Sequence, residues 1–261
     1  MIHPAAVDAA IEELARAGFL APTAEAAELA AAARDDEAVL AGMVERRTTG
    51  EPLAWITGTT TFCGETVRID PGVYVPRPQT EDLARAAVDL LPERGVAIDL
   101  CTGSGAIAAV LARRRPQARV VGTDIDPAAI ACARANGIDA FLGDLDRPVP
   151  PELVGRVDLV VGVVPYVPTE SLHLLPRDVT AHEPAVALDG GPGGTDVLDR
   201  AVVAAARLLR PGAWLLLELG GGQPAHLRPH LAANRFERIE VHVDEEGDPR
   251  AIRGRATQPS S

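Results

Sequence analysis

Acidic residues and glycines stand at the ends of successive apolar runs. In "AIDLCTGSGAIA" (97–108), Gly103 and Gly105 allow a tight turn and a close backbone approach to a ligand. Asp124 closes the next apolar run, where a carboxylate can accept hydrogen bonds from both ribose hydroxyls. Asp144 closes a third run, in position to meet an adenine amino group. Because doubly wound sheets bind ligands at the carboxyl ends of their strands, these residues predict an adenosine site.

Two kinds of adenosine cofactor fit this pattern. "GSGAIA" also matches a dinucleotide-binding turn, so a nicotinamide-dependent dehydrogenase is a competing hypothesis. Asp99, just before the turn, would repel a pyrophosphate but attract the ammonium group of S-adenosylmethionine. The chain has no lysine, which removes Tyr-Lys dehydrogenases, Walker phosphate loops and pyridoxal Schiff bases. We therefore expect S-adenosylmethionine as cofactor, with these binding residues: Asp99, Cys101, Thr102, Gly103, Ser104, Gly105, Asp124, Ile125, Asp144 and Leu145.

Histidines and one arginine bear on the chemistry less directly. His226 and His230 could share a helix face, but Pro229 lies between them and no third ligand is evident, so no metal site is expected. Arg77 lies between two prolines in a rigid extended segment. We expect it either to face the mouth of the site or to pair with Glu81 or another acid.

Strand and helix patterns alternate after residue 79, which predicts a doubly wound α/β sheet. "GVAIDL", "ARVVGTD", "RVDLVVGVV" and "AWLLLEL" are short apolar runs typical of buried parallel strands. Helical segments begin near Ser104, Pro127 and Thr195. The segment "FERIEVHVDEEGDPRAIRGRA" has two strand patterns around an acidic turn that contains glycine. It predicts an antiparallel hairpin at the edge of the sheet.

The chain before residue 79 differs in composition from the rest. Its first part is rich in alanine, and Val7, Ile11 and Leu14 recur at helical spacing. β-branched residues then alternate with threonine and glycine, which is typical of a hairpin. The expected division is a small N-terminal helical domain over 1–50, a β-hairpin linker over 51–78, the cofactor-binding α/β domain over 79–256 and a loose tail over 257–261.

Composition and charge narrow the class of protein. A chain of 261 residues with 47% hydrophobic residues can bury the core of one sizeable domain and a small appendage. A net charge of −12 disfavours direct nucleic-acid binding. No apolar run approaches the ~18 residues of a membrane span, and the acidic N-terminal segment is unlike a secretory signal. Three cysteines without a CxxC pair are typical of reduced thiols, so a cytoplasmic location is expected.

Several longer motifs follow one another in a defined order. They are "EPLAWITG", "VYVPRPQTE", "DLCTGSGAIA", "GTDIDPAAI", "VPYVP", "EPAVALDGGPGG", "LRPGAWLLLELGGGQ" and the terminal "VDEEGDPRAIRGRA". In this order they resemble the protein-glutamine N5-methyltransferases that modify release factors, from about residue 44 to residue 256. The resemblance implies a class I S-adenosylmethionine-dependent methyltransferase domain with a Rossmann-like sheet and a closing hairpin. It also implies that the N-terminal helices recognise the substrate.

The chain departs from the resembled family at several positions. Cys101 replaces the first glycine of the cofactor turn, and Leu145 stands where an aromatic residue often flanks the adenine. The family's Pro-Arg-Pro-Glu-Thr segment has glutamine here, and the substrate-side residues implied are Arg77, Gln79 and Thr80. The family's catalytic Asn-Pro-Pro-Tyr motif appears as Val163, Val164, Pro165 and Tyr166.

The lost asparagine leaves the methyl acceptor open. In the resembled family its side chain and a backbone carbonyl accept hydrogen bonds from the glutamine amide, whereas Val163 has no polar atom. The leading hypothesis is a methyltransferase of the glutamine-N5 type with altered specificity, acting on a protein such as a release factor. The alternatives are a small-molecule N- or O-methyltransferase of a specialised pathway and a regulatory protein that binds the cofactor without turnover.

Overall fold

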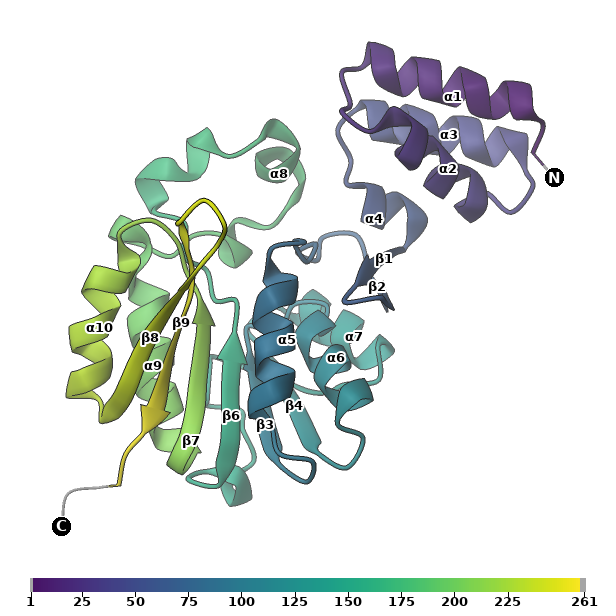
Figure 1. Ribbon diagram of the computed structural model, residues 1–261. Helices are drawn as coiled ribbons and strands as arrows, with labels where there is room; N and C mark the ends of the chain where they lie inside the picture. The colour runs from purple at the N-terminus through teal and green to yellow at the C-terminus, as the bar shows by residue number, and fades with distance from the viewer. Residues whose placement is uncertain (1, 259–261) are drawn as a thin grey trace.

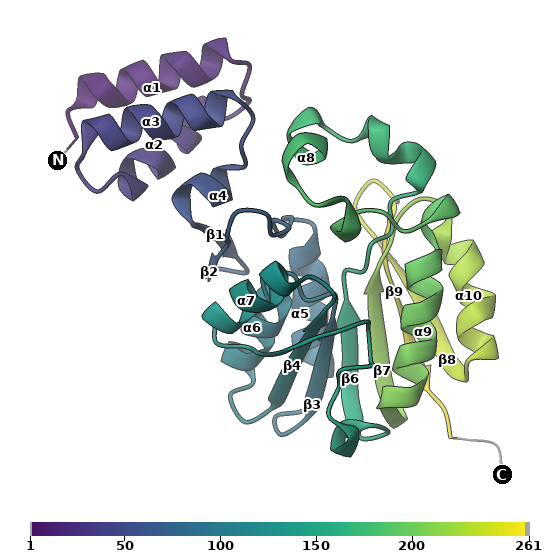
Figure 2. The same cartoon turned by 180° about the vertical axis from the view of Figure 1, so that it is seen from behind.

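A seven-stranded sheet forms the centre of the molecule (Figures 1 and 2). The structure is a computed structural model, and it describes residues 2–258, apart from the side chains of residues 177 and 178. The strand order is β5-β4-β3-β6-β7-β9-β8. The parallel strands are β3 (Val96–Leu100), β4 (Arg119–Asp124), β5 (Asp139–Leu142), β6 (Val157–Gly162) and β7 (Leu209–Glu218). The hairpin of β8 (Phe236–Val243) and β9 (Pro249–Ala256) joins β7 antiparallel through β9, so the predicted sheet and closing hairpin are confirmed.

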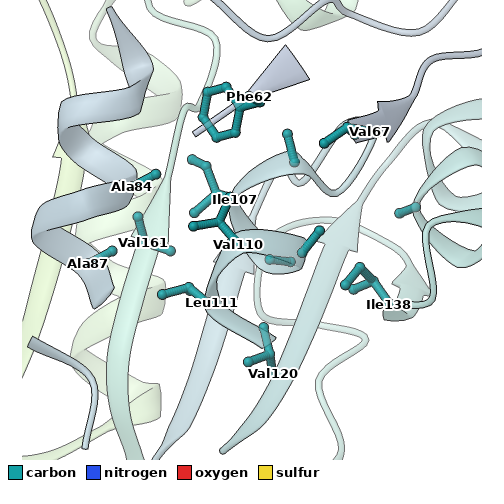
Figure 3. Close-up of a cluster of buried hydrophobic side chains, with 14 of the residues drawn as sticks. Phe62, Val67, Ala84, Ala87, Ile107, Val110, Leu111, Val120, Ile138 and Val161 are labelled. Atoms are coloured by element: carbon teal, nitrogen blue, oxygen red, sulfur yellow. The ribbon is translucent and has the colours of Figure 1, made fainter. Parts of the chain in front are cut away.

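Helices cover both faces of the sheet. On one face lie α5 (Thr80–Leu90), α6 (Ala106–Arg114) and α7 (Pro127–Ala135), and on the other lie α9 (Asp196–Leu208) and α10 (Gln223–Ala233). Figure 3 shows the core between the sheet and the first three of these helices, where Ala84 and Ala87 bring α5 close to Leu111 and Val161. Small aliphatic side chains fill most of this core, because only 3% of the residues in the chain are aromatic. Each fully buried leucine or valine contributes about 1.5–3 kcal/mol.

Three N-terminal helices enclose a separate core. They are α1 (Pro4–Arg16), α2 (Pro22–Ala32) and α3 (Glu37–Thr48), and they bury Leu14, Leu29, Leu40 and Val44 together. Ile56 of the short helix α4 (Leu53–Thr57) closes this core. In Figure 1 the three helices project from the sheet domain and are joined to it through α4 and the hairpin of β1 and β2.

The segment predicted to be a hairpin linker begins with a helical turn instead. Pro52 precedes α4 and Gly58 ends it with a φ of 78°, which is a common way to bracket a helix. The hairpin is limited to β1 (Thr59–Phe62) and β2 (Glu65–Arg68).

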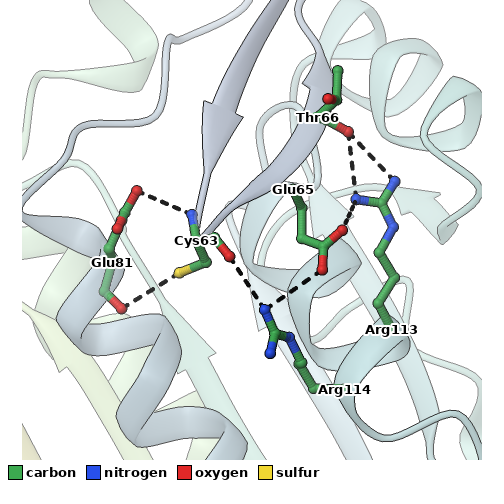
Figure 4. Close-up of polar contacts among 6 residues, drawn as sticks. All are labelled: Cys63, Glu65, Thr66, Glu81, Arg113 and Arg114. Atoms are coloured by element: carbon green, nitrogen blue, oxygen red, sulfur yellow. Dashed lines mark hydrogen bonds and ion pairs between the residues drawn. The ribbon is translucent and has the colours of Figure 1, made fainter.

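Contacts fix this hairpin to the α/β domain (Figure 4). The Cys63 N–H donates to Glu81 of α5 at 3.0 Å. Glu65 pairs with Arg113 of α6 at 3.2 Å and with the neighbouring Arg114 at 3.6 Å. Phe62 is buried in the core beneath α5 and α6. The hairpin is therefore packed as part of the sheet domain.

A long connection between β6 and α9 lies across the carboxyl ends of the strands (Figure 2). We call residues 168–190 the covering segment. It contains η2 (Thr169–Leu174), α8 (Arg177–His182) and η3 (Ala185–Ala187), and η4 (Pro192–Gly194) follows it. The Val167 N–H donates to Leu188 at 3.0 Å and the Gly190 N–H donates to Val167 at 2.8 Å, so the segment is closed at its base.

The remaining features are peripheral. The short helix η1 (Pro151–Leu153) precedes β6. The loose tail was expected over 257–261. Thr257 is anchored, because its N–H donates to Arg235 at 2.9 Å, and residues 259–261 lie outside the described residues. Within residues 2–258, every helix is too short or too polar to cross a bilayer.

Candidate functional site

A cavity of about 370 Å³ lies at the carboxyl ends of β3, β4 and β6, beneath the covering segment. In the sheet, β3 lies between β4 and β6, and this change in connection direction is where doubly wound sheets bind ligands. All but one of the expected cofactor residues line the cavity: Asp99, Cys101, Thr102, Gly103, Ser104, Asp124, Ile125, Asp144 and Leu145. Gly105 is the exception.

The turn after β3 combines two glycines with different roles. Gly103 has a φ of 55°, and a Cβ there would meet no atom within 4 Å, so its backbone is open toward a ligand. Gly105 has a φ of 78°, and a Cβ would lie 3.1 Å from Ala133 and Ile138. Gly105 therefore serves the packing of α6 against α7 and not direct contact. Cys101 has a φ of 55° without being glycine, which strains the backbone where the resembled family has glycine.

Asp99 is only 1% exposed at the end of β3. Its Oδ2 accepts the Thr102 hydroxyl at 2.7 Å and the Ala108 N–H at 3.3 Å. Within residues 2–258, no hydrogen bond goes to Oδ1, and the residue lines the cavity. Burial raises the pKa of Asp99 to about 7, because a buried carboxylate loses hydration. A ligand cation at Oδ1 would restore the charged form.

Asp124 organises the turn from the end of β4. Its Oδ2 accepts the Gly103 N–H and its Oδ1 accepts the Asp126 N–H, both at 2.9 Å. Burial raises the pKa of Asp124, and these two N–H donors oppose the increase. A carboxylate has about four lone-pair positions, so two remain that can accept hydroxyl groups of a sugar.

The carboxylate expected to meet adenine is already ion-paired. Asp144 pairs with Arg200 of α9, and Arg200 also lines the cavity, near Ile125, Leu145 and Val197. This end of the cavity therefore combines apolar side chains with a guanidinium group. Sequence reasoning missed Arg200, because an arginine in the middle of an amphipathic helix carries no motif signal.

Only half of the degenerate substrate motif reaches the cavity. Val163 and Pro165 line it. Val164 is buried in the core on the α9 face, and the Tyr166 hydroxyl donates to Glu218 at 3.0 Å. Side chains alternate after β6, so Val163 and Pro165 face the cavity while Val164 and Tyr166 pack behind it, and the catalytic role expected of the motif stays a prediction.

The expected substrate-side residues also separate. Thr80 lines the cavity and donates its hydroxyl hydrogen to Oε2 of Glu218 at 2.7 Å. Gln79 lies one residue before α5 and lines a second cavity on the other side of that helix end. Gln79 is thus separated from the main cavity, and its role on the substrate side stays a prediction.

Arg77 does not line the main cavity, so the second of its two expected alternatives holds. Its guanidinium group donates to Glu183 of the covering segment at 2.6 Å and lies 4.8 Å from the centre of the Tyr74 ring. The partner is thus Glu183 and not Glu81. This ion pair connects the segment before α5 to the covering segment directly next to Pro184, which lines the cavity.

Sequence reasoning also missed Tyr74, Glu218 and the stretch Pro184–Ala187. A usable signal existed for Glu218, because it closes the apolar strand β7 as Asp99 and Asp124 close theirs. Tyr74 and Pro184–Ala187 line the cavity from irregular segments, and their positions depend on tertiary folding.

Comparison with known proteins identifies the family. Residues 97–180 match a family model described as a methyltransferase domain. The release factor glutamine methyltransferase of Geobacter sulfurreducens is 37% identical over 227 residues, which cover 85% of this chain and 79% of that protein. The chain belongs to the release factor glutamine methyltransferase family. It is an S-adenosylmethionine-dependent methyltransferase, and the dehydrogenase hypothesis is wrong.

Another relative is named for a different substrate. The 4-amino-L-phenylalanine/4-methylamino-L-phenylalanine methyltransferase of Streptomyces pristinaespiralis is 39% identical over 246 residues, covering 84% of each chain. Among solved structures, the ribosomal protein L11 methylase of Lactobacillus delbrueckii subsp. bulgaricus has a TM-score of 0.53 at 18% identity. That match covers 74% of this chain and 86% of the other, and it supports the fold.

The cavity of this methyltransferase fits the charges and groups of S-adenosylmethionine. The cofactor is cationic at sulfur and carries an ammonium group, two ribose hydroxyls and an adenine. Asp99 presents an oxygen to a cation, Asp124 keeps positions for hydroxyls, and Gly103 leaves open space for close backbone approach. Ile125 and Leu145 offer apolar contact to a flat ring.

Proposed function

We propose that this enzyme methylates an uncharged nitrogen of a mainly apolar acceptor in preference to a glutamine carboxamide. The observation that carries the proposal is Val163, which lines the cavity where the family's motif has asparagine.

The nitrogen of a carboxamide is a poor nucleophile because its lone pair is delocalised into the carbonyl group. Hydrogen-bond acceptors that hold its two N–H groups therefore supply much of the rate. Val163 provides none, and an N–H left unpaired costs about 1–3 kcal/mol. Losing one such orienting contact reduces the rate by about 10²–10³. An arylamine keeps more of its lone pair and is neutral near pH 7.

The neighbouring side chains support an apolar acceptor. Tyr74, Pro76, Pro165 and Pro184 line the same cavity as Val163, and together they offer an apolar wall with one aromatic ring. The Streptomyces pristinaespiralis relative is named for an arylamine substrate, which supports such an acceptor within this family.

A release-factor glutamine is the second candidate. It is favoured by the name of the Geobacter sulfurreducens relative and by Pro165 and Tyr166, which are retained from the motif. Under this candidate the acceptor is a protein, and helices α1–α3 would help to recognise it. Either acceptor suits a cytoplasmic enzyme, and all three cysteines are free thiols.

The residues of this chain bind and align the reactants. S-adenosylmethionine, when bound, would supply a sulfonium-bound methyl group for in-line attack by a nucleophile, with the thioether sulfur as the leaving group. Asp99 and Asp124 hold the donor, and the covering segment excludes water through Pro184–Ala187. Val163 and Tyr74 bound the space that the acceptor nitrogen must enter.

Transfer of labelled methyl by Val163→Asn tests this proposal. We expect the wild type to methylate 4-amino-L-phenylalanine and to act weakly on a release-factor glutamine. Val163→Asn should raise the glutamine rate, because it restores an acceptor for the amide N–H. Val163→Ala is the matched control, since it changes the side chain without adding a polar atom. Brisk wild-type methylation of the release factor would refute the proposal.

A further inference from the structure

A buried carboxylate lies directly behind the acceptor end of the cavity. Glu218, at the end of β7, is 3% exposed. Its Oε2 accepts the Thr80 hydroxyl at 2.7 Å and its Oε1 accepts the Tyr166 hydroxyl at 3.0 Å. Both partners are neutral hydroxyls, so Glu218 can gain a proton without breaking an ion pair. Arg250 of β9, whose positive charge acts on Glu218, is itself bonded to Asp244 at 2.6 Å.

The Thr80 hydroxyl is oriented by this carboxylate. A hydroxyl has one hydrogen and two lone pairs. Because the hydrogen points to Glu218, a lone pair is left to accept a hydrogen bond in the cavity that Thr80 lines. Val163 and Pro165 line the same cavity, so Thr80 offers the kind of acceptor atom that Val163 lacks.

Glu218 itself lines a second cavity and not the one that Thr80 lines. This second cavity has a volume of about 440 Å³ and lies between α5 and the β7-β9-β8 part of the sheet. The rim residues Gln79, Asp82 and His242 are exposed, so this cavity opens to water. Thr80 lines only the first cavity and Glu218 only the second. Their hydrogen bond therefore links the acceptor space to solvent.

We propose that Thr80 accepts the N–H of the acceptor nitrogen and passes the proton released by methylation to Glu218, which delivers it to water in the second cavity. The inference rests on the proposed function in that the acceptor is a nitrogen carrying hydrogen. It holds for an arylamine and for a carboxamide alike. Thr80 is the catalytic residue of this pair, and Glu218, which acts through it, is the positioning residue.

The proton transfer balances without any further reactant. The nitrogen lone pair forms the bond to the methyl carbon as the carbon–sulfur bond breaks, with its electron pair left on sulfur. The nitrogen, now cationic, gives its proton to the Thr80 oxygen while the hydroxyl hydrogen of Thr80 moves to Oε2 of Glu218. Glu218 then loses that proton to water, and both side chains return to their starting forms.

The surroundings of Glu218 suit a proton acceptor. Burial raises its pKa, while the hydroxyls of Thr80 and Tyr166 and the positive charges of Arg250 and Arg77 oppose the increase. The pKa remains above that of an ordinary glutamate. The carboxylate form accepts the proton, so activity should fall as the pH drops through this pKa.

Methyl-transfer kinetics of the full-length enzyme on both 4-amino-L-phenylalanine and a release factor test the proposal. Thr80→Val should lower kcat by about 10²-fold while binding of S-adenosylmethionine is retained. Thr80→Ser, which keeps the hydroxyl, should restore most of the rate. Glu218→Gln still accepts the Thr80 hydrogen bond but takes no proton, so kcat should fall and the low-pH limb of kcat/KM should disappear. Asp139→Asn, on an exposed carboxylate at the start of β5 that lines neither cavity, is the matched control and should leave kcat and its pH profile unchanged.

The results for the proton route and for the proposed acceptor can be distinguished. An unchanged kcat in Thr80→Val, or a low-pH limb that persists in Glu218→Gln, would overturn the proton route. Preference for the release factor would overturn the proposed acceptor, while the effects of the variants on that substrate would still decide the proton route. No transfer to either acceptor by a cofactor-bound wild type would overturn both.

Discussion

At the scale of single residues, Asp99 couples the stability of the fold to pH. In the folded protein its pKa is raised to about 7, whereas an unfolded aspartate titrates near 3.9. Between these values the folded state holds a proton that the unfolded state has lost. The contribution of Asp99 to the free energy of unfolding therefore falls as the pH rises from about 4 to about 7. Above that range it stays constant.

Asp99→Asn removes this dependence and keeps the hydrogen bonds. Its amide oxygen can accept from Thr102 and Ala108 as Oδ2 does. We expect the variant to gain stability relative to the wild type by roughly 2–3 kcal/mol between about pH 5 and pH 8. Urea unfolding of the cofactor-free proteins measures this. Equal pH slopes in the two proteins would show that Asp99 titrates normally.

Asp124 is the residue whose loss should weaken cofactor binding most directly. Asp124→Ala leaves the ribose hydroxyls without a charged acceptor, which costs about 1.5–3 kcal/mol, or roughly 10- to 150-fold in Kd. Titration calorimetry with S-adenosylmethionine measures the change. Asp139→Asn, an exposed carboxylate at the far end of β5, should bind as the wild type does. Equal affinity in Asp124→Ala would contradict the assigned site.

Single residues were predictable where a strand ends and a turn begins. Asp99, Gly103 and Asp124 follow this rule, since their positions depend on local strand and turn patterns. Glu218 follows the same rule at β7 and was overlooked. Arg200 had no such signal, because its contact with Asp144 joins segments far apart in the chain.

At the scale of elements, the cavity is independent of the N-terminal helices. Its lining begins at Tyr74, and α1–α3 close a core of their own with Ile56. We predict that removal of residues 1–50 leaves cofactor binding nearly intact and weakens turnover of a protein acceptor. Calorimetry and methyl transfer on the truncated protein measure the two effects. Loss of cofactor binding in a folded truncated protein would show that the helices support the donor site.

The irregular elements were the least predictable from sequence. Helix α4 is set by Pro52 and Gly58, a local signal hidden within a β-branched segment. The covering segment has no periodic pattern, because its shape depends on contacts such as Arg77 with Glu183 and on closure at Val167. Regular strands were recognised because burial on both faces imposes continuous apolar runs.

At the scale of the whole molecule, one edge of the sheet gathers the residues that we assign to the two substrates. Strands β3 and β4 carry Asp99 and Asp124, and the loop after β6 carries Val163 at the same edge. Residues of the covering segment and of the stretch around Tyr74 complete the lining of the cavity. The parallel sheet was predictable from the alternation of strand and helix patterns. The irregular segments that complete the cavity were not.

The choice of acceptor is tested most directly by one competition experiment. Full-length enzyme is incubated with labelled S-adenosylmethionine and equal concentrations of a release factor and 4-amino-L-phenylalanine, and mass spectrometry identifies the methylated products. We predict label on the arylamine nitrogen in large excess over the glutamine, because Val163 cannot hold a carboxamide N–H. Label mainly on the release-factor glutamine, at a rate matching a family member that has the motif asparagine, would contradict the assigned role of Val163.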